Sequence, residues 1–217
     1  MSNSPSSAHS IKALFQDCPV IAVIRIESAE RAVDLARTLV DAGLSALEIT
    51  LRTPAACEAI RLISTEVPEA VVGAGTVLNA QDLEQVAQAG ARFAIAPGCT
   101  EALYRASAST GIPLVPGIAT ASEIMAGIEQ GHDCFKFFPA QAAGGVNLLK
   151  AWSGPFPAAR FIPTGGITID NAPSYLALAS VPAVGGSWMV PEEAIAAGDW
   201  SRISRLARAC QSLKRPG

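Results

Sequence analysis

Eight short apolar runs recur along this chain about every 20 to 25 residues, and this repetition constrains the fold more than any other feature. Amphipathic segments lie between the runs, and the clearest has the spacing of one buried helix face, at Ala32, Leu35, Ala36, Leu39 and Val40. The apolar runs cover residues 20–26, 46–50, 71–76, 93–97, 114–118, 134–139, 160–165 and 183–188. The pattern therefore predicts eight strands, each followed by a helix.

Apolar strands that alternate with helices are typical of a parallel sheet covered by helices, and eight such units can close into a barrel. We therefore predict an α/β fold, a small (β/α)8 TIM barrel that forms a single domain over residues 1–217. Residues 1–6 are expected to be a flexible tail, and residues 7–17 an extra N-terminal helix under the barrel. An open doubly wound sheet is the alternative, although no strand is followed by the glycine patterns with which such sheets hold nucleotides.

Residues suited to helix ends support these boundaries. Residues with capping side chains precede three of the expected helices, at Thr53, Asn79 and Thr120. Glycines stand where four helices would end in a left-handed residue, at Gly43, Gly90, Gly111 and Gly131.

The composition argues against several classes of function. No apolar stretch approaches the roughly 18 residues that span a bilayer, and the first ten residues are polar and serine-rich, so we expect a soluble, cytoplasmic protein with no membrane partner. The net charge of −3 and the lack of a basic cluster give no footprint for nucleic acid. The five cysteines are scattered without a CxxC pair, which argues against a disulfide framework and a zinc site.

Lys136 lies inside the apolar run 134–139 and is the residue that most needs an explanation. Apolar surroundings disfavour the charged ammonium and so favour a neutral, nucleophilic amine, which is the form that makes Schiff bases with carbonyl compounds. The alternative is a lysine whose stem packs on aromatic rings while its head reaches water.

Other polar residues follow the ends of the predicted strands, where barrels carry their chemistry. Alternation places Glu48 on the same face of its strand as Ala46 and Thr50, so Glu48 would be half of a buried ion pair or a general base. Arg52 and Thr76, at neighbouring strand ends, are suited to hold a carboxylate.

Paired glycines follow the last two strands, at Gly165-Gly166 and Gly185-Gly186. Backbone amides at these two positions form the usual phosphate site of a barrel, so the sequence predicts a phosphorylated small-molecule substrate. The only histidines are His9, in the polar tail, and His132, in a predicted turn, so no histidine-rich metal site is expected.

Taken in order, these strings resemble the 2-keto-3-deoxy-6-phosphogluconate (KDPG) aldolase and 4-hydroxy-2-oxoglutarate (KHG) aldolase family. The resemblance runs from about residue 19 to 213 and includes Val23-Ile24-Arg25, Glu48-Ile49-Thr50-Leu51-Arg52-Thr53, Gly73-Ala74-Gly75-Thr76, Phe135-Lys136-Phe137-Phe138-Pro139, Pro163-Thr164-Gly165-Gly166 and Gly185-Gly186-Ser187-Trp188. It implies a class I aldolase, a homotrimer without metal or cofactor, that cleaves KDPG to pyruvate and glyceraldehyde 3-phosphate and also accepts 4-hydroxy-2-oxoglutarate.

The resemblance also implies a role for each matching residue. Lys136 matches the Schiff-base lysine, Glu48 the general acid/base, and Arg52 and Thr76 the contacts to the pyruvyl carboxylate. The phosphate side is matched by Gly165, Gly166, Gly186 and Ser187, the pocket lining by Pro97, Phe138 and Thr164, and a mouth arginine by Arg25.

Other functions remain open at this point. Thr164 and Ser187 resemble the residues of the gluconate type, and this resemblance implies KDPG rather than its galactonate epimer, on which a sister group of aldolases acts. A phosphate-binding barrel isomerase or epimerase would use Lys136 only as an electrostatic clamp, and a sugar-phosphate sensor would bind without turnover. A pyridoxal phosphate enzyme would also use a lysine and a phosphate site.

Overall fold

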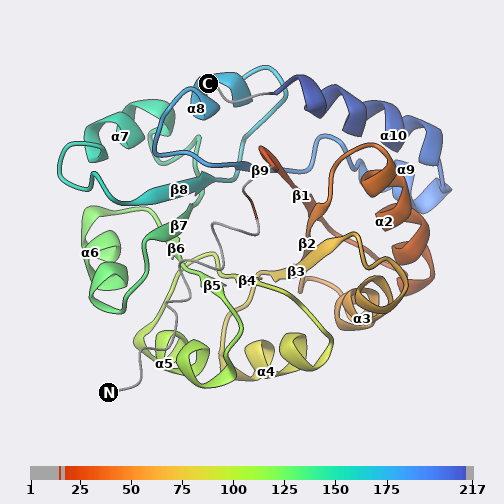
Figure 1. The fold of residues 1–217 in the computed structure, drawn as a ribbon, viewed down its shortest axis with the longest axis horizontal. Coiled ribbons are helices and arrows are strands. Elements are labelled where there is room, and N and C mark those ends of the chain that lie inside the picture. The colour runs from red at the N-terminus through yellow and green to blue at the C-terminus, as the bar shows by residue number, and fades with distance from the viewer. Residues whose placement is uncertain (1–14, 16–17, 214–217) are drawn as a thin grey trace.

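The computed structural model describes residue 15 and residues 18–213, and its strands form a ring with helices outside it (Figure 1). Every strand pairing is parallel. One sheet has the order β5-β4-β3-β2-β1-β9 and the other the order β6-β7-β8. The strands are β1 (Val20–Ile24), β2 (Ala46–Thr50), β3 (Val71–Gly75), β4 (Ala94–Ile95), β5 (Leu114–Val115), β6 (Gly117–Ile118), β7 (Cys134–Phe137), β8 (Arg160–Pro163) and β9 (Val184–Gly186).

The two sheets meet at two seams that close the ring. Only Pro116 separates β5 from β6, and proline has no backbone N–H with which to continue a ladder. At the other seam a single parallel bridge joins Thr164 to Gly185, after β8 and within β9. The predicted fifth strand is divided into β5 and β6. When these two are counted as one, eight strands form the barrel, which confirms the predicted fold.

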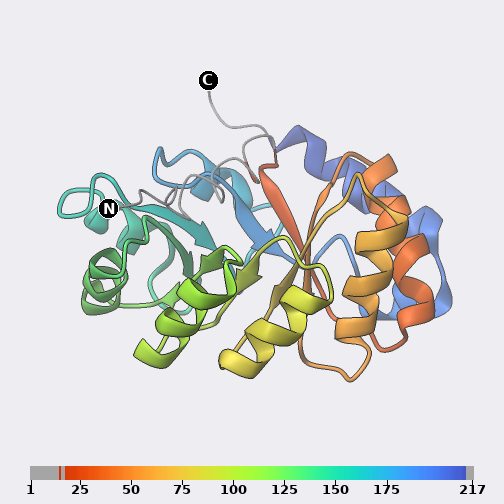
Figure 2. The ribbon, with the colours of Figure 1, turned by 60° about the horizontal axis from the view of Figure 1, so that its bottom comes forward.

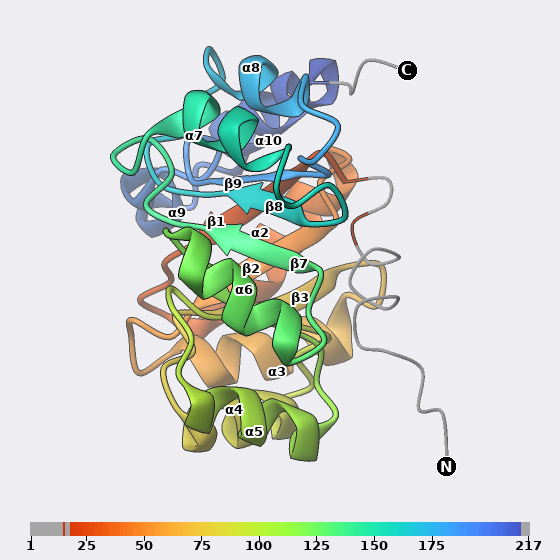
Figure 3. The ribbon, with the colours of Figure 1, turned by 90° about the vertical axis from the view of Figure 1, so that its left-hand side faces the viewer.

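Helices cover the outside of the ring, and Figure 2 shows α4 and α5 side by side along it. In Figure 3, which looks onto α6, the strands β7 and β8 run side by side. The helices are α2 (Ala32–Asp41), α3 (Ala56–Glu66), α4 (Ala80–Gln88), α5 (Glu101–Thr110), α6 (Ala121–Glu129), α7 (Gly145–Trp152), α8 (Ala172–Leu176), α9 (Glu192–Ala197) and α10 (Trp200–Ala209), with 3-10 turns η1 (Ala29–Arg31) and η2 (Cys210–Ser212).

Two of the three predicted capping residues are confirmed. Asn79 accepts a hydrogen bond from Asp82 N at the start of α4, and Thr120 forms a capping box with Glu123 at the start of α6. The prediction for Thr53 is wrong, because its hydroxyl donates to Ile26 O at 2.6 Å and α3 begins three residues later. This contact ties the chain after β2 to the chain after β1, a long-range partner that local sequence does not reveal.

The strands divide the apolar residues into two layers. A large cluster lies between the strands and the helices. A smaller cluster fills the inside of the barrel, and it consists of Phe15, Ile21, Ala46, Phe93, Ile95, Val115, Cys134, Ile162 and Ala183. Because side chains alternate along a strand, residues two positions further toward the carboxyl end also point into the barrel, above this apolar plug.

Some predictions fall outside the described residues or differ from them. The predicted tail at residues 1–6 lies outside them, as does the predicted helix at residues 7–17 apart from Phe15. Most strands end one or two residues earlier than predicted, because the last residues of the predicted runs already belong to the loops. Within residues 18–213 no helix is long and apolar enough to cross a membrane.

His132 gives the fold a dependence on pH. It lies in the turn before β7, packed on the Tyr104 ring at 5.2 Å, and burial lowers the pKa of its imidazole from the ordinary value of 6.5. As the pH falls through that value, the unfolded chain binds a proton that the folded chain does not, so the free energy of unfolding decreases. We expect His132→Gln to lose less stability than the native chain between about pH 7.5 and pH 5.5, measured by urea unfolding. Parallel losses in both proteins would contradict this expectation.

Candidate active site

A lysine and a glutamate meet inside the barrel, near the carboxyl ends of the strands. Lys136 Nζ on β7 lies 3.0 Å from Glu48 Oε1 on β2. The side chains are only 7% and 1% exposed, respectively. The sequence predicted Glu48 as half of a buried ion pair or a general base and Lys136 as a lysine in apolar surroundings, and the structure brings them together from opposite parts of the ring.

Strand alternation explains why both side chains point inward. Ala46 and Cys134 belong to the apolar plug, and Glu48 and Lys136 follow them by two residues on the same faces. Burying two charged groups costs several kcal/mol for each, and close pairing offsets this cost. The ion pair thus forms the polar layer directly above the plug.

Glu48 has a second carboxylate oxygen that is ready for another partner. Its Oε2 atom is buried and has no hydrogen-bond partner among the described residues. Buried polar oxygens are rarely left unpaired, so Oε2 is suited to accept a hydrogen bond from a group of a bound ligand.

Gly75 provides the space in which this carboxylate lies. A Cβ atom on Gly75 would come within 2.1 Å of Glu48 Oε1 and 2.7 Å of its Cδ. From the sequence, Gly75 was only part of a family resemblance, and this role was not predicted. The sequence did carry a signal for this role, because a glycine at an inner-face position of β3, the neighbour of β2, leaves that position without a side chain.

Of the predicted lining residues, one contacts the lysine and two others lie at strand ends of the same barrel. The ring of Phe138 has its centroid 5.4 Å from Lys136 Nζ, a distance at which a cation and an aromatic ring attract. Thr164, only 6% exposed, follows the plug residue Ile162 by two positions and so also faces inward. Pro97 lies against Gly117, where a Cβ atom would come within 2.2 Å of the Pro97 carbonyl carbon.

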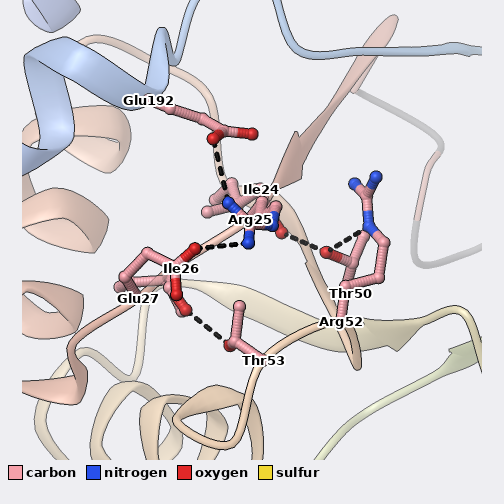
Figure 4. Close-up of polar contacts among 8 residues, drawn as sticks. All are labelled: Ile24, Arg25, Ile26, Glu27, Thr50, Arg52, Thr53 and Glu192. Atoms are coloured by element: carbon pink, nitrogen blue, oxygen red, sulfur yellow. Dashed lines mark hydrogen bonds and ion pairs between the residues drawn. The ribbon is translucent and has the colours of Figure 1, made fainter.

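Arg52 and Thr76 lie after β2 and β3, and Figure 4 shows how Arg52 is held. Its Nε donates to Thr50 Oγ1 at 3.1 Å, and the Thr50 hydroxyl donates in turn to Ile24 O at 2.9 Å. The bond to Thr50 is the only side-chain hydrogen bond of Arg52 in the described chain, so both terminal amino groups can pair with a carboxylate in fork geometry.

Thr76 has an unusual backbone. Its φ is +59°, and among the described residues it is the only one other than glycine with a positive φ. A β-branched residue in this region is strained, and such strain concentrates at ligand-binding sites. Sequence patterns carry no signal for this conformation.

Arg25 lies at the mouth, where it already has two partners. It forms ion pairs with Glu27 at 2.5 Å and with Glu192 at 3.0 Å, the latter from the start of α9 (Figure 4). Val23 pairs in register with Glu48, and Arg25, two residues after Val23 and one after the end of β1, continues the inner face of that strand. The two carboxylates hold its guanidinium near the rim.

The predicted glycine pairs lie beside each other because the Thr164–Gly185 bridge joins the ends of β8 and β9. Gly165 and Gly166 have φ values of +96° and +76°, which other residues rarely adopt. Gly186 packs on the Trp188 ring, where a Cβ atom would come within 1.8 Å, and Ser187 is exposed. Backbone amides can therefore approach a ligand closely at this edge.

These contacts define what the site can do. An amine and a carboxylate in a water-poor interior can form a Schiff base and move a proton. Arg52 on one side and glycine amides on the other can bind two anionic groups. In residues 18–213 no three His, Cys, Asp or Glu side chains gather as metal ligands.

Comparison with known proteins gives consistent matches over nearly the whole chain. The family model described as "KDPG and KHG aldolase" matches residues 11–206. The "KHG/KDPG aldolase" of Escherichia coli is 54% identical over 208 residues, which cover 96% of each chain.

Solved structures agree. A KDPG aldolase from Legionella pneumophila, with pyruvate captured as a covalent carbinolamine, is 50% identical with a TM-score of 0.88, and the match covers 91% of this chain and 96% of that one. A 2-keto-3-deoxy-6-phosphogluconate aldolase from Zymomonas mobilis, solved with 3-phosphoglycerate, is 45% identical with a TM-score of 0.90, covering 96% and 98% of the two chains.

The space at Gly75 can be tested through stability. Gly75→Ala would push the Glu48 carboxylate away from Lys136, and we expect the free energy of unfolding to fall by about 1–3 kcal/mol, as for other overpacked interiors. Urea unfolding provides the measurement. Gly154→Ala is the matched control, because a Cβ atom on Gly154 would have no atom within 4 Å. Equal stability of the two variants would mean that the interior has room to spare.

Proposed function

The chain belongs to the KDPG and KHG aldolase family, and from this premise we propose that it cleaves KDPG to pyruvate and glyceraldehyde 3-phosphate through a Schiff base on Lys136. Such an enzyme is a class I aldolase, a carbon–carbon lyase. Cleavage of 4-hydroxy-2-oxoglutarate to pyruvate and glyoxylate is the proposed second activity. The observation that carries the proposal is the buried contact of 3.0 Å between Lys136 Nζ and Glu48 Oε1.

In the first step Lys136 passes its proton to Glu48, and the neutral amine then attacks the C2 carbonyl of the substrate. The amine nitrogen bonds to C2, and the carbonyl oxygen takes a proton to give a carbinolamine. Glu48 assists the proton transfers, water leaves, and an iminium forms that can accept electrons. The covalent carbinolamine in the Legionella pneumophila relative supports this step.

The carbon–carbon bond breaks next. Glu48, directly or through a water molecule, removes the proton of the C4 hydroxyl, for which its unpaired Oε2 is suited. The electrons of the C3–C4 bond move toward the iminium, so an enamine remains on Lys136 and glyceraldehyde 3-phosphate leaves. Protonation at C3 and hydrolysis then release pyruvate and restore the lysine.

Two anion sites hold the substrate across this pair. Arg52 and Thr76 bind the carboxylate, and Gly165, Gly166, Gly186 and Ser187 bind the phosphate. Pro97, Phe138 and Thr164 line the space between, and Arg25 contributes positive charge at the mouth. Fixing both ends places the scissile bond between base and iminium, which is how orientation accelerates a reaction. The 3-phosphoglycerate in the Zymomonas mobilis relative supports a phosphate site.

Finer assignments are also part of the proposal. Thr164 and Ser187 support the gluconate epimer as the preferred substrate, rather than the galactonate one. We further propose a homotrimer, a cytoplasmic location, a single domain, and a reaction without metal or cofactor.

The Schiff base can be trapped. Borohydride reduction in the presence of pyruvate should add about 72 Da to the peptide that contains Lys136, the increment for reductive attachment of pyruvate to an amine. Lys136→Ala should give no adduct and no cleavage, whereas Lys150→Ala, a change at an exposed lysine of α7, should behave as the native chain. Turnover by Lys136→Ala would refute the role of this lysine, and an isomerase or epimerase would then be the better assignment.

Glu48→Gln separates proton transfer from binding. The amide keeps the shape of the side chain but is not a base, so turnover should fall by about 10² or more. Pyruvate binding, measured by calorimetry, should remain similar in the native chain and the variant. Glu69→Gln, at an exposed position before β3, is the control. Native-like turnover by Glu48→Gln would assign the proton transfers to another group.

A further inference from the structure

We propose that Asn171 is a positioning residue for the phosphate group of the substrate, and that it acts through the backbone of Gly166. The inference rests on the proposed function and extends it to a residue outside the site described above. Asn171 lies directly before α8, on the outer side of the loop that follows β8.

Two successive carbonyl groups in this loop are held from the outside. Gly165 O accepts a hydrogen bond from Gln141 N at 3.0 Å, in the segment after β7. Gly166 O accepts one from Asn171 Nδ2 at 2.9 Å. Each bond fixes the rotation of one peptide plane.

The opposite side of each plane carries an N–H group. In a trans peptide the N–H points away from the C=O, so the amides of Gly166 and Ile167 are directed away from Gln141 and Asn171. The strand on the other side of β8 is β9, joined there by the Thr164–Gly185 bridge. In the described chain neither amide donates to another group, so both are available to an anion between the ends of β8 and β9.

The loop after β8 contains two successive glycines, so hydrogen bonds are needed to fix its peptide planes. Glycine has more conformational freedom than any other residue, and Gly165 and Gly166 both have positive φ. Without a bond to its carbonyl, the peptide after Gly166 can rotate and turn its N–H out of the site. Donors bind an anion most strongly when they are already oriented.

The orientation of the Asn171 amide is itself fixed. Its Oδ1 accepts from Thr168 N at 2.9 Å, and an N–H can pair only with the oxygen, so Nδ2 must face Gly166 O. A second side chain from α8 supports the neighbouring segment, because Tyr175 OH donates to Gln141 Oε1 at 2.8 Å. Residues at the start of α8 and within it therefore fix both groups that hydrogen-bond to the loop: Asn171 binds Gly166 O directly, and Tyr175 holds Gln141, whose N–H binds Gly165 O.

The test compares a phosphorylated and a phosphate-free substrate. In Asn171→Ala we expect the KM for KDPG to rise about tenfold, the scale of one lost net hydrogen bond. The kcat for KDPG, the kinetics with 4-hydroxy-2-oxoglutarate and the borohydride adduct with pyruvate should stay at native values. A general structural defect would change all of these together.

Two further variants keep the test interpretable. Asn171→Ser retains an oxygen that can accept from Thr168 N but is too short to reach Gly166 O, so it should show the same selective rise in KM if the alanine variant folds poorly. Asn147→Ala, at an exposed asparagine of α7, is the matched control and should resemble the native chain.

The possible outcomes are distinct. A native KM for KDPG in both Asn171 variants, or equal losses with both substrates, would overturn the role of Asn171 while leaving the aldolase assignment intact. A native chain that cleaves neither substrate and forms no adduct with pyruvate would overturn the proposed function itself.

Discussion

The buried contact between Lys136 and Glu48 is the constraint on which the rest of the site depends. Both charges have left water, and their attraction at 3.0 Å offsets that cost only while the two partners stay in place. Glu48 belongs to the six-stranded sheet and Lys136 to the three-stranded one, so the pair also spans the two sheets inside the barrel. Gly75 leaves space for the Glu48 carboxylate, and the Phe138 ring lies near Lys136 Nζ.

The two proposed anion sites work by different physical means. Arg52 is an exposed side chain with a full charge, and although Thr50 holds its Nε, its two terminal amino groups lose freedom when they pair with a carboxylate. The loop after β8 uses partial charges on backbone amides, which are held by bonds on its outer side and lose little freedom on binding. A substrate with a carboxylate at one end and a phosphate at the other suits this asymmetry.

Sequence reasoning found what depends on local periodicity. Period-two alternation placed Glu48 on the same face of its strand as Ala46 and Thr50, the apolar run 134–139 singled out Lys136, and the recurrence of strands predicted the barrel. It failed where a distant partner decides the outcome, as for the Thr53 hydroxyl on Ile26 O and the ion pair of Arg25 with Glu192. The division of the fifth strand was signalled by Pro116, but the strained φ of Thr76 had no sequence signal.

The pairing of β7 with β8 also fixes the distance between two parts of the proposed substrate site. Lys136 pairs in register with Ile162, and the same strand continues to the turn at Gly165 and Gly166. Ladder hydrogen bonds within one sheet thus set the span between the proposed nucleophile and the proposed phosphate site. The separation of these two proposed sites is therefore fixed by backbone register rather than by any single side chain.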